Sequence, residues 1–116
     1  MFTRGILACI LSESTTPAGY GEFCETNQNL IRTLAKLHVE QLLDSIPVDE
    51  FFDKFMQGYR EHGRKCNFEN EGWVHEFKME ALDLFNYKAM ELYSLSLREP
   101  NAMANLYLMY APFLNA

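Results

Sequence analysis

The sequence predicts an all-α protein, a single compact domain over residues 1–116 with four to five helices joined by short loops. Two observations support this prediction. No segment sustains the alternation of polar and apolar residues that is typical of strands. Several segments instead repeat apolar residues every three or four positions, as one face of a helix does. The length is that of one ordinary domain, and no linker, internal repeat or low-complexity tract divides it.

The chain opens with an apolar run over residues 5–11. This run is too short to cross a bilayer, which takes about 20 apolar residues, and residues 16–18 make a poor signal-peptide cleavage site. We therefore expect a short helical segment packed in the core. In residues 12–26, which follow, Pro17, Gly19 and Gly21 stand among Ser and Thr residues, and this composition predicts a loop.

The next helix is predicted to begin after Asn27, a favourable N-cap residue, and to end near residues 45–47. Its apolar positions recur at helical spacing: Ile31, Leu34, Ala35, His38 and Leu42. A further helix is predicted from Val48 to about Gly63, where a helix C-terminus is indicated. Its apolar face is heavy and consists of Val48, Phe51, Phe52, Phe55, Met56 and Tyr59.

The longest periodic run is predicted to start after Asn70 as its N-cap and to close at or just before Pro100. A continuous polar stripe at steps of three and four marks one solvent-facing side, at positions 76, 80, 83, 87, 91, 94 and 98. Residues 101–116 are predicted to form one more short helix, which ends before Pro112.

Composition and charge narrow the class of protein. Hydrophobic residues make up 48% of the chain and charged residues 22%, as in a globular protein rather than a disordered one. The net charge of −6 argues against broad non-specific binding to nucleic acid or anionic membranes. The three cysteines, Cys9, Cys24 and Cys66, are an odd number without a C-x-x-C motif, so we expect reduced thiols and a cytoplasmic protein.

Residues 101–116 contain no charged residue, and we call them the uncharged tail. This tail is the most informative segment, because a surface helix normally carries charge on one face. Apolar and aromatic residues surround its axis, so it is either central in the core or covered by another chain. Tyr and Met are favoured at the centres of interfaces. We therefore expect a partner interface at Met103, Leu106, Tyr107, Tyr110 and Phe113, with a purely intramolecular core as the alternative.

Two charged clusters are further candidates. Arg60, Arg64 and Lys65 could contact an anion or nucleic acid, although cations also gather at helix C-termini because the helix dipole favours them there. Three carboxylates on one helical face could dock a basic partner, although an ordinary solvated face explains them equally simply. They are Glu76, Glu80 and Asp83.

No catalytic or metal-binding motif stands out in the sequence. His38 on an apolar face fits a buried histidine held by one hydrogen bond better than a catalytic one. His62 and Cys66 are four apart but lack further ligands for zinc. Cys24 falls in the predicted loop, where an exposed thiolate would need a borrowed base, and no G-x-S-x-G motif is present. We expect no cofactor and no metal.

The sequence thus favours a small acidic protein that acts through protein–protein contact and has no catalytic activity of its own. It would be a regulator, an inhibitor or an accessory subunit of a larger complex, acting as a homodimer or with another protein. The alternative is a nucleic-acid-associated factor that uses the basic cluster at residues 60–65.

Overall fold

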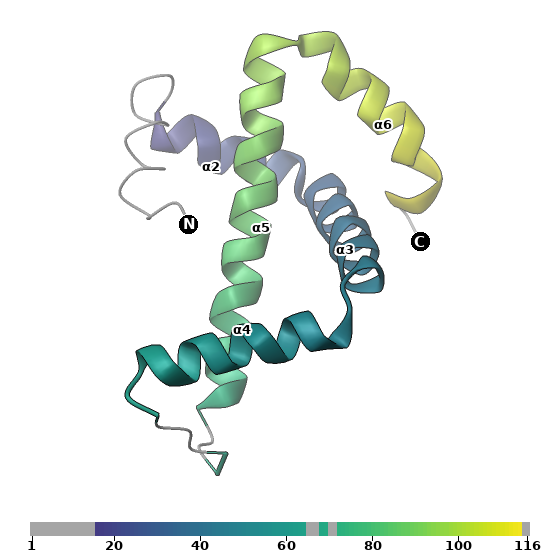
Figure 1. The fold of residues 1–116 in the computed structure, drawn as a ribbon. Coiled ribbons are helices and arrows are strands. Elements are labelled where there is room, and N and C mark those ends of the chain that lie inside the picture. Colours follow the sequence, from purple (N-terminus) through teal and green to yellow (C-terminus); the bar gives the residue numbers. More distant parts are fainter. Residues whose placement is uncertain (1–15, 65–67, 70–71, 115–116) are drawn as a thin grey trace.

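The computed structural model describes residues 16–64, 68–69 and 72–114, and these residues form an all-helical fold without strands (Figure 1). The predicted fold class is therefore confirmed. Five helices are present in the described part of the chain: α2 (Pro17–Thr26), α3 (Gln28–Ser45), α4 (Val48–Glu61), α5 (Trp73–Arg98) and α6 (Pro100–Leu114).

The core lies where α3, α5 and α6 meet, with α2 packed across α3 and α5. Leu30, Ile31 and Leu34 project from the first half of α3 and are almost fully buried. They meet Ala89 and Leu92 from the second half of α5, and Met103 of α6 completes the cluster. We call α2, α6 and the halves of α3 and α5 that pack with them the core module.

Residues 17–26 form helix α2, so the predicted loop is wrong for this segment. The Thr16 hydroxyl caps the helix by accepting a hydrogen bond from the Gly19 amide at 3.1 Å, and Pro17 occupies a first-turn position that suits proline. Glycine disfavours a helix by about 1 kcal/mol relative to alanine. Packing offsets this cost, because the Tyr20 and Phe23 rings lie 5.6 and 5.0 Å from the Tyr93 ring.

Asn27 joins three helices rather than capping α3 with its side chain. Its Nδ2 donates to the Phe23 carbonyl at 2.8 Å, and its backbone amide donates to the same oxygen at 3.0 Å. The Tyr107 hydroxyl of α6 donates to Asn27 Oδ1. This buried amide therefore terminates α2 and ties α6 to the junction of α2 and α3.

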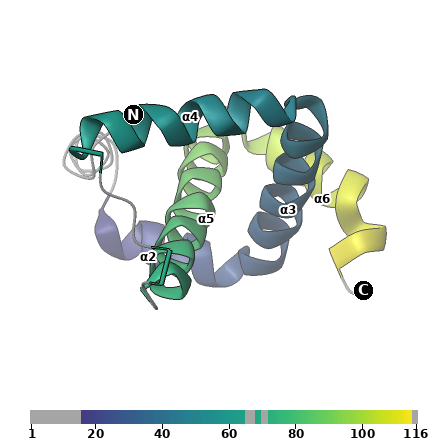
Figure 2. The ribbon, with the colours of Figure 1, turned by 60° about the horizontal axis from the view of Figure 1, so that its bottom comes forward.

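The second region of the molecule is open. Helix α4 makes no extensive contact with another helix of the described residues, and it lies along one side of the molecule, apart from α2 (Figure 2). The first half of α5 is exposed on most of its surface. The radius of gyration, 17.3 Å, exceeds the roughly 13 Å of a compact chain of this length. The expectation of a compact domain is thus corrected to a somewhat extended one.

Helix α4 ends as the sequence indicates, at a glycine in the left-handed region. Gly63 has φ +73°, the His62 amide donates to the Gly58 carbonyl at 2.9 Å, and the Arg64 amide reaches back to the Tyr59 carbonyl at 2.8 Å. A bond that spans one residue more than the helical repeat, with glycine inside it, is the Schellman termination.

Helix α6 continues through Pro112 to Leu114, so the predicted stop before that proline is wrong. Proline removes one helical donor, and the carbonyl that loses it belongs to Leu108, an exposed residue whose backbone water can reach. Leu114 packs against the core and holds the last turn in place.

Five expected positions of the polar stripe on α5 are exposed, namely 76, 80, 87, 91 and 98, whereas Asp83 and Ser94 are half-buried. Helix α3 begins directly after Asn27, as predicted, and α5 follows Gly72. The predictions for the segment 5–11, for Cys9, Lys65 and Cys66, and for Asn70 as an N-cap fall outside the described residues.

Candidate protein-interaction surface

The apolar face of α4 is left uncovered by the other described helices. Its sequence places apolar residues on one side of the helix and charged residues on the other, yet no α4 residue is buried. Phe52 keeps 61% of its surface exposed and Phe55 keeps 44%. We define the α4 apolar face by its exposed or half-buried residues Val48, Phe51, Phe52, Phe55, Met56 and Tyr59, together with Phe68.

The aromatic rings of this face stack on one another. The Phe55 ring centroid lies 6.2 Å from that of Phe52 and 6.4 Å from that of Tyr59, as expected for neighbours three and four residues apart. Phe68, beyond the end of α4, stacks on Phe55 at 6.3 Å although 79% of its surface is exposed. The four rings therefore form one contiguous aromatic cluster on this face.

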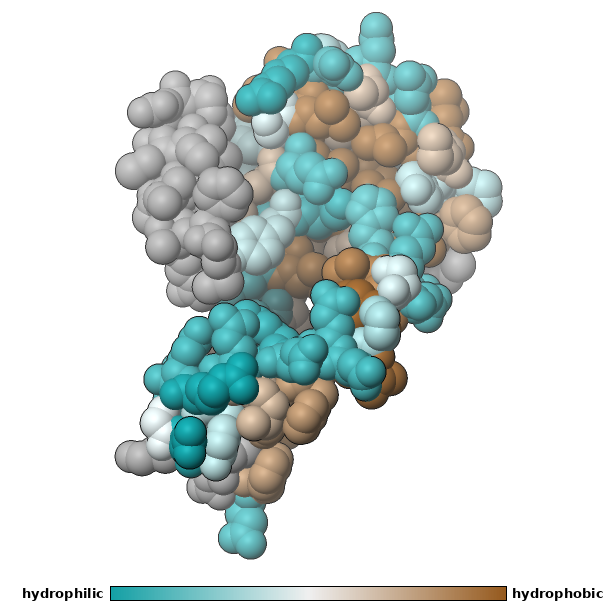
Figure 3. Space-filling model, viewed as in Figure 1, coloured by the Kyte–Doolittle hydropathy of each residue, from teal (hydrophilic) through white to brown (hydrophobic). Residues whose placement is uncertain are grey.

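Figure 3 shows the hydrophilic side of α4 toward the viewer, with apolar side chains gathered below it. Leu42 and Leu43, at the end of α3 just before α4, are also more than half exposed. Soluble monomers rarely expose a contiguous apolar patch larger than a few hundred Å² without using it. The α4 apolar face is therefore a candidate docking surface.

The first half of α5 carries a second set of exposed apolar residues. Trp73, Phe77 and Leu84 recur at helical spacing, and Phe77 is 79% exposed. In Figure 2 the ribbon of α4 lies apart from the start of α5, and the two helices make no extensive contact. We call α4, Phe68 and residues 73–84 of α5 the arm.

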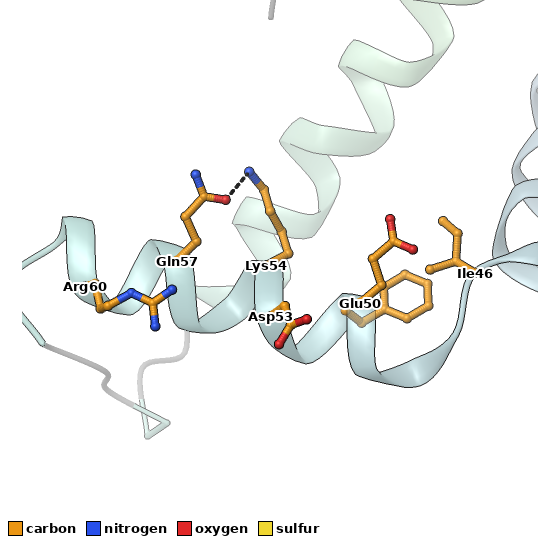
Figure 4. Close-up of a pocket in the computed structure, with 7 residues that line it drawn as sticks. Ile46, Glu50, Asp53, Lys54, Gln57 and Arg60 are labelled. Atoms are coloured by element: carbon orange, nitrogen blue, oxygen red, sulfur yellow. Dashed lines mark hydrogen bonds between the residues drawn. The ribbon is translucent and has the colours of Figure 1, made fainter.

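The polar side of α4 borders a hollow of about 500 Å³, lined by Ile46, Glu50, Phe51, Asp53, Lys54, Gln57 and Arg60. Figure 4 shows Asp53 pointing to the side of the helix opposite Lys54 and Gln57. Lys54 Nζ donates to Gln57 Oε1 at 3.4 Å, and Gln57 Nε2 donates to Glu61 Oε1 at 3.1 Å. All lining residues come from α4 and from Ile46 just before it, so the hollow is one-sided and its polar groups do not converge as those of a catalytic cleft do.

A polar cluster that the sequence analysis missed lies between α3 and α5. Lys88 is only 8% exposed, and its Nζ lies 2.6 Å from His38 Nδ1 and 3.0 Å from Glu91 Oε2. An ammonium group has only donors, so His38 Nδ1 accepts and the neutral ring carries its proton on Nε2. In the sequence, Lys88 and Glu91 are one helical turn apart, and this spacing could have indicated their ion pair.

His38 itself is exposed, so its predicted burial is wrong. The reason is that His38 lies beyond the buried residues of α3, which end at Ala35, and meets α5 through the Lys88 side chain. The expected hydrogen bond is present, and Lys88 supplies it.

The five tail residues expected at an interface divide between two environments. Met103 is buried in the core, and Leu106, Tyr107 and Tyr110 lie half-buried against it. Burial raises the pKa of the Tyr107 hydroxyl. Phe113 is exposed and stacks at a tilt on Tyr110 with 6.5 Å between centroids. With Leu108 and Met109 it forms the outer face of α6.

The two charged clusters lie on the arm. Arg60 is in the last turn of α4, and Arg64 follows it with φ 60°. Glu76 and Glu80 are exposed on the first half of α5, with Asp83 half-buried one turn further. Among the described residues, no ion pair is found between Arg60 or Arg64 and Glu76 or Glu80.

Cys24 lies in α2 and packs partly buried against the core, not in an exposed loop. Burial, reinforced by the neighbouring Cys24 thiol, raises the pKa of the Tyr20 hydroxyl well above its usual range. Within the described residues, no group of three or more His, Cys, Asp or Glu side chains is arranged to hold a metal ion. None of the described helices is both long and apolar enough to cross a membrane.

Comparison with protein-family models, with curated proteins and with solved structures finds no match to this chain.

Proposed function

We propose that this protein acts through protein–protein contact, with the α4 apolar face as its docking surface and no catalytic activity of its own. The observation that supports this proposal is the exposure of Phe52, Phe55 and Phe68 in one stacked aromatic cluster. Aromatic residues supply large contact area at low cost in conformational entropy and are enriched at binding hot spots. A regulator, an inhibitor or an accessory subunit would use such a surface.

The charged residues around the face fit a protein partner better than a membrane or nucleic acid. Helices that lie on membranes are usually rich in Lys and Arg on their polar side, whereas α4 carries Asp49, Glu50, Asp53 and Glu61 against Lys54 and Arg60. The net charge of −6 opposes nucleic-acid phosphates as well. Mixed charge around an apolar centre is the usual composition of a protein interface.

The experiment is partner capture with the full chain, by crosslinking and affinity purification from its native cell, with Phe52→Ser/Phe55→Ser as the test variant. We expect the variant to keep the wild-type helical circular dichroism, because neither side chain belongs to the core. It should lose the proteins that the wild type captures, including any second copy of the chain.

The matched control is Leu108→Ser/Met109→Ser, which removes two apolar residues of α6 that are more exposed than Phe52 and Phe55. This control should capture the same proteins as the wild type. The proposal is wrong if the Phe52→Ser/Phe55→Ser variant captures the wild-type set, or if only the α6 control loses it.

A further inference from the structure

We propose that the partner of the α4 apolar face is a second copy of this chain, with the two α4 helices packed antiparallel across a two-fold axis. This inference rests on the proposed function and identifies the protein that the surface binds. It draws on the distribution of charge along α4 and on the apolar area that the face leaves exposed.

One flank of α4 carries charges that separate along its length. Asp49 and Asp53 lie in its first half and Arg60 in its last turn, whereas Lys54 and Glu61, which have the opposite signs, lie on another side of the helix. A parallel pair of such helices would set acidic residues against acidic residues. An antiparallel pair sets the acidic half of each copy beside the basic end of the other.

The flanks of the helix also match. Asp53 and Arg60 are seven residues apart, two helical turns, and therefore lie on the same flank of the apolar face, as does Asp49. Two antiparallel helices that meet through their apolar faces set each flank against the same flank of the partner. In a two-fold interface each contact occurs twice. Asp53 of each copy thus faces Arg60 of the other.

The exposed area fits a dimer. The exposed fractions of Phe51, Phe52, Phe55 and Phe68 correspond to about 450 Å² at roughly 200 Å² for each aromatic side chain. A stable interface buries about 800 Å² on each partner. Val48 at the start of α4 and the adjoining Leu42 and Leu43 are all more than half exposed and supply most of the remainder.

The test measures the mass of the full-length protein by light scattering coupled to gel filtration between 1 and 100 µM, a range of about two decades around a micromolar dissociation constant. The expected result is a dimer of two 13.5 kDa chains at the upper end. Asp53→Arg and Arg60→Asp should each weaken the dimer by about tenfold or more, since each breaks two charge pairs. The double variant Asp53→Arg/Arg60→Asp restores opposite charges at both positions and should recover the dimer.

Two further variants separate the possible outcomes. Glu22→Arg makes the same reversal of charge as Asp53→Arg at an exposed position of α2 and should leave the dimer intact. Phe52→Ser/Phe55→Ser should give a helical monomer. A wild-type monomer at 100 µM overturns the inference, as does a dimer that survives the Phe52→Ser/Phe55→Ser change or a double variant that stays as weak as the single ones.

The inference and the proposed function can fail separately. If the wild type is monomeric but loses another captured protein on Phe52→Ser/Phe55→Ser substitution, the docking surface stands and the second copy is wrong. A monomer that binds phosphatidylcholine–phosphatidylserine vesicles through the same two residues overturns both.

Discussion

The core module and the arm use apolar residues of different kinds. The buried cluster of the core module consists of Leu, Ile, Ala and Met, and of the phenylalanines within the described residues only Phe23 and Phe85 pack partly buried against it. None of the eight phenylalanines within the described residues is buried, and five of the six exposed ones belong to the arm: Phe51, Phe52, Phe55, Phe68 and Phe77. Aliphatic residues make the fully buried cluster, Tyr93 and several partly buried rings pack around it, and most phenylalanines lie on the surface of the arm. Apolar content alone therefore does not indicate which segments make the core.

The largest expected contrast between the two regions comes from truncating one apolar residue in each. Ile31 is fully buried, so Ile31→Ala should lower the free energy of unfolding by about 2–5 kcal/mol through lost burial and the cavity left behind. Phe52→Ala removes a larger side chain from the arm, but it should change the free energy of unfolding by less than about 0.5 kcal/mol. Urea unfolding at a protein concentration low enough to keep the chain monomeric measures both. Equal losses would show that α4 is packed in solution and would contradict the distinction between the core module and the arm.

A smaller effect is expected from removing the side-chain hydrogen bonds of Asn27, the polar tie of the core module. Asn27→Ala removes the acceptor for Tyr107 and the side-chain donor to the Phe23 carbonyl. We expect a loss of about 1–3 kcal/mol, the usual cost of leaving buried polar groups unsatisfied. Tyr107→Phe, measured alone and with Asn27→Ala, gives the coupling energy of the pair from chemical denaturation. Additive effects of the two substitutions would contradict the tie.

A third effect is confined to alkaline pH. The pKa values of Tyr20 and Tyr107 are raised in the folded chain, chiefly by burial. The unfolded chain therefore loses these protons first, near pH 10. Stability from these groups is complete below about pH 10 and falls as the pH rises above it. Tyr20→Phe should flatten the decline of the urea midpoint between pH 9 and 11. A decline as steep as that of the wild type would rule out Tyr20 as its source.

The smallest expected effects are those of two glycines in and next to α4. A Cβ atom added to Gly58 meets nothing within 4 Å, so Gly58→Ala should favour the α4 helix by about 1 kcal/mol. Gly63→Ala should disfavour the helix end by a similar amount, because its φ of +73° strains any other residue. Circular dichroism at 222 nm should rise for the first variant and fall for the second. The urea midpoint should stay the same for both, and a clear shift would mean that α4 unfolds together with the core module.

Helical periodicity was sufficient to predict α3, α4 and the body of α5, because each repeats apolar residues over more than three turns. It was not sufficient for α2, where Gly19 and Gly21 suggested a loop and outweighed the i, i+3 spacing of Tyr20 and Phe23. It also misplaced the end of α6, since one proline near a C-terminus removes only one helical hydrogen bond.

The candidate site was only partly within reach of sequence reasoning. The apolar face of α4 was visible, but an amphipathic helix looks the same whether its face meets the core or solvent. Coverage depends on which helices pack together, and periodicity does not specify that. The contact between Lys88 and His38 joins residues fifty positions apart, so only the crossing of α3 and α5 creates it.

Helix α5 belongs to both regions and is continuous. Its 26 residues span about 39 Å, and Figure 1 shows it as one uninterrupted rod. Its second half packs in the core module with α2, α3 and α6, while its first half is mostly exposed among the described residues. It therefore acts as a lever whose pivot is the core module. A tilt of a few degrees at Ala89 moves Trp73, about 24 Å along the axis, by one or two ångströms. A molecule that binds near Trp73 and tilts the helix would therefore act on the packing of the core module at the other end.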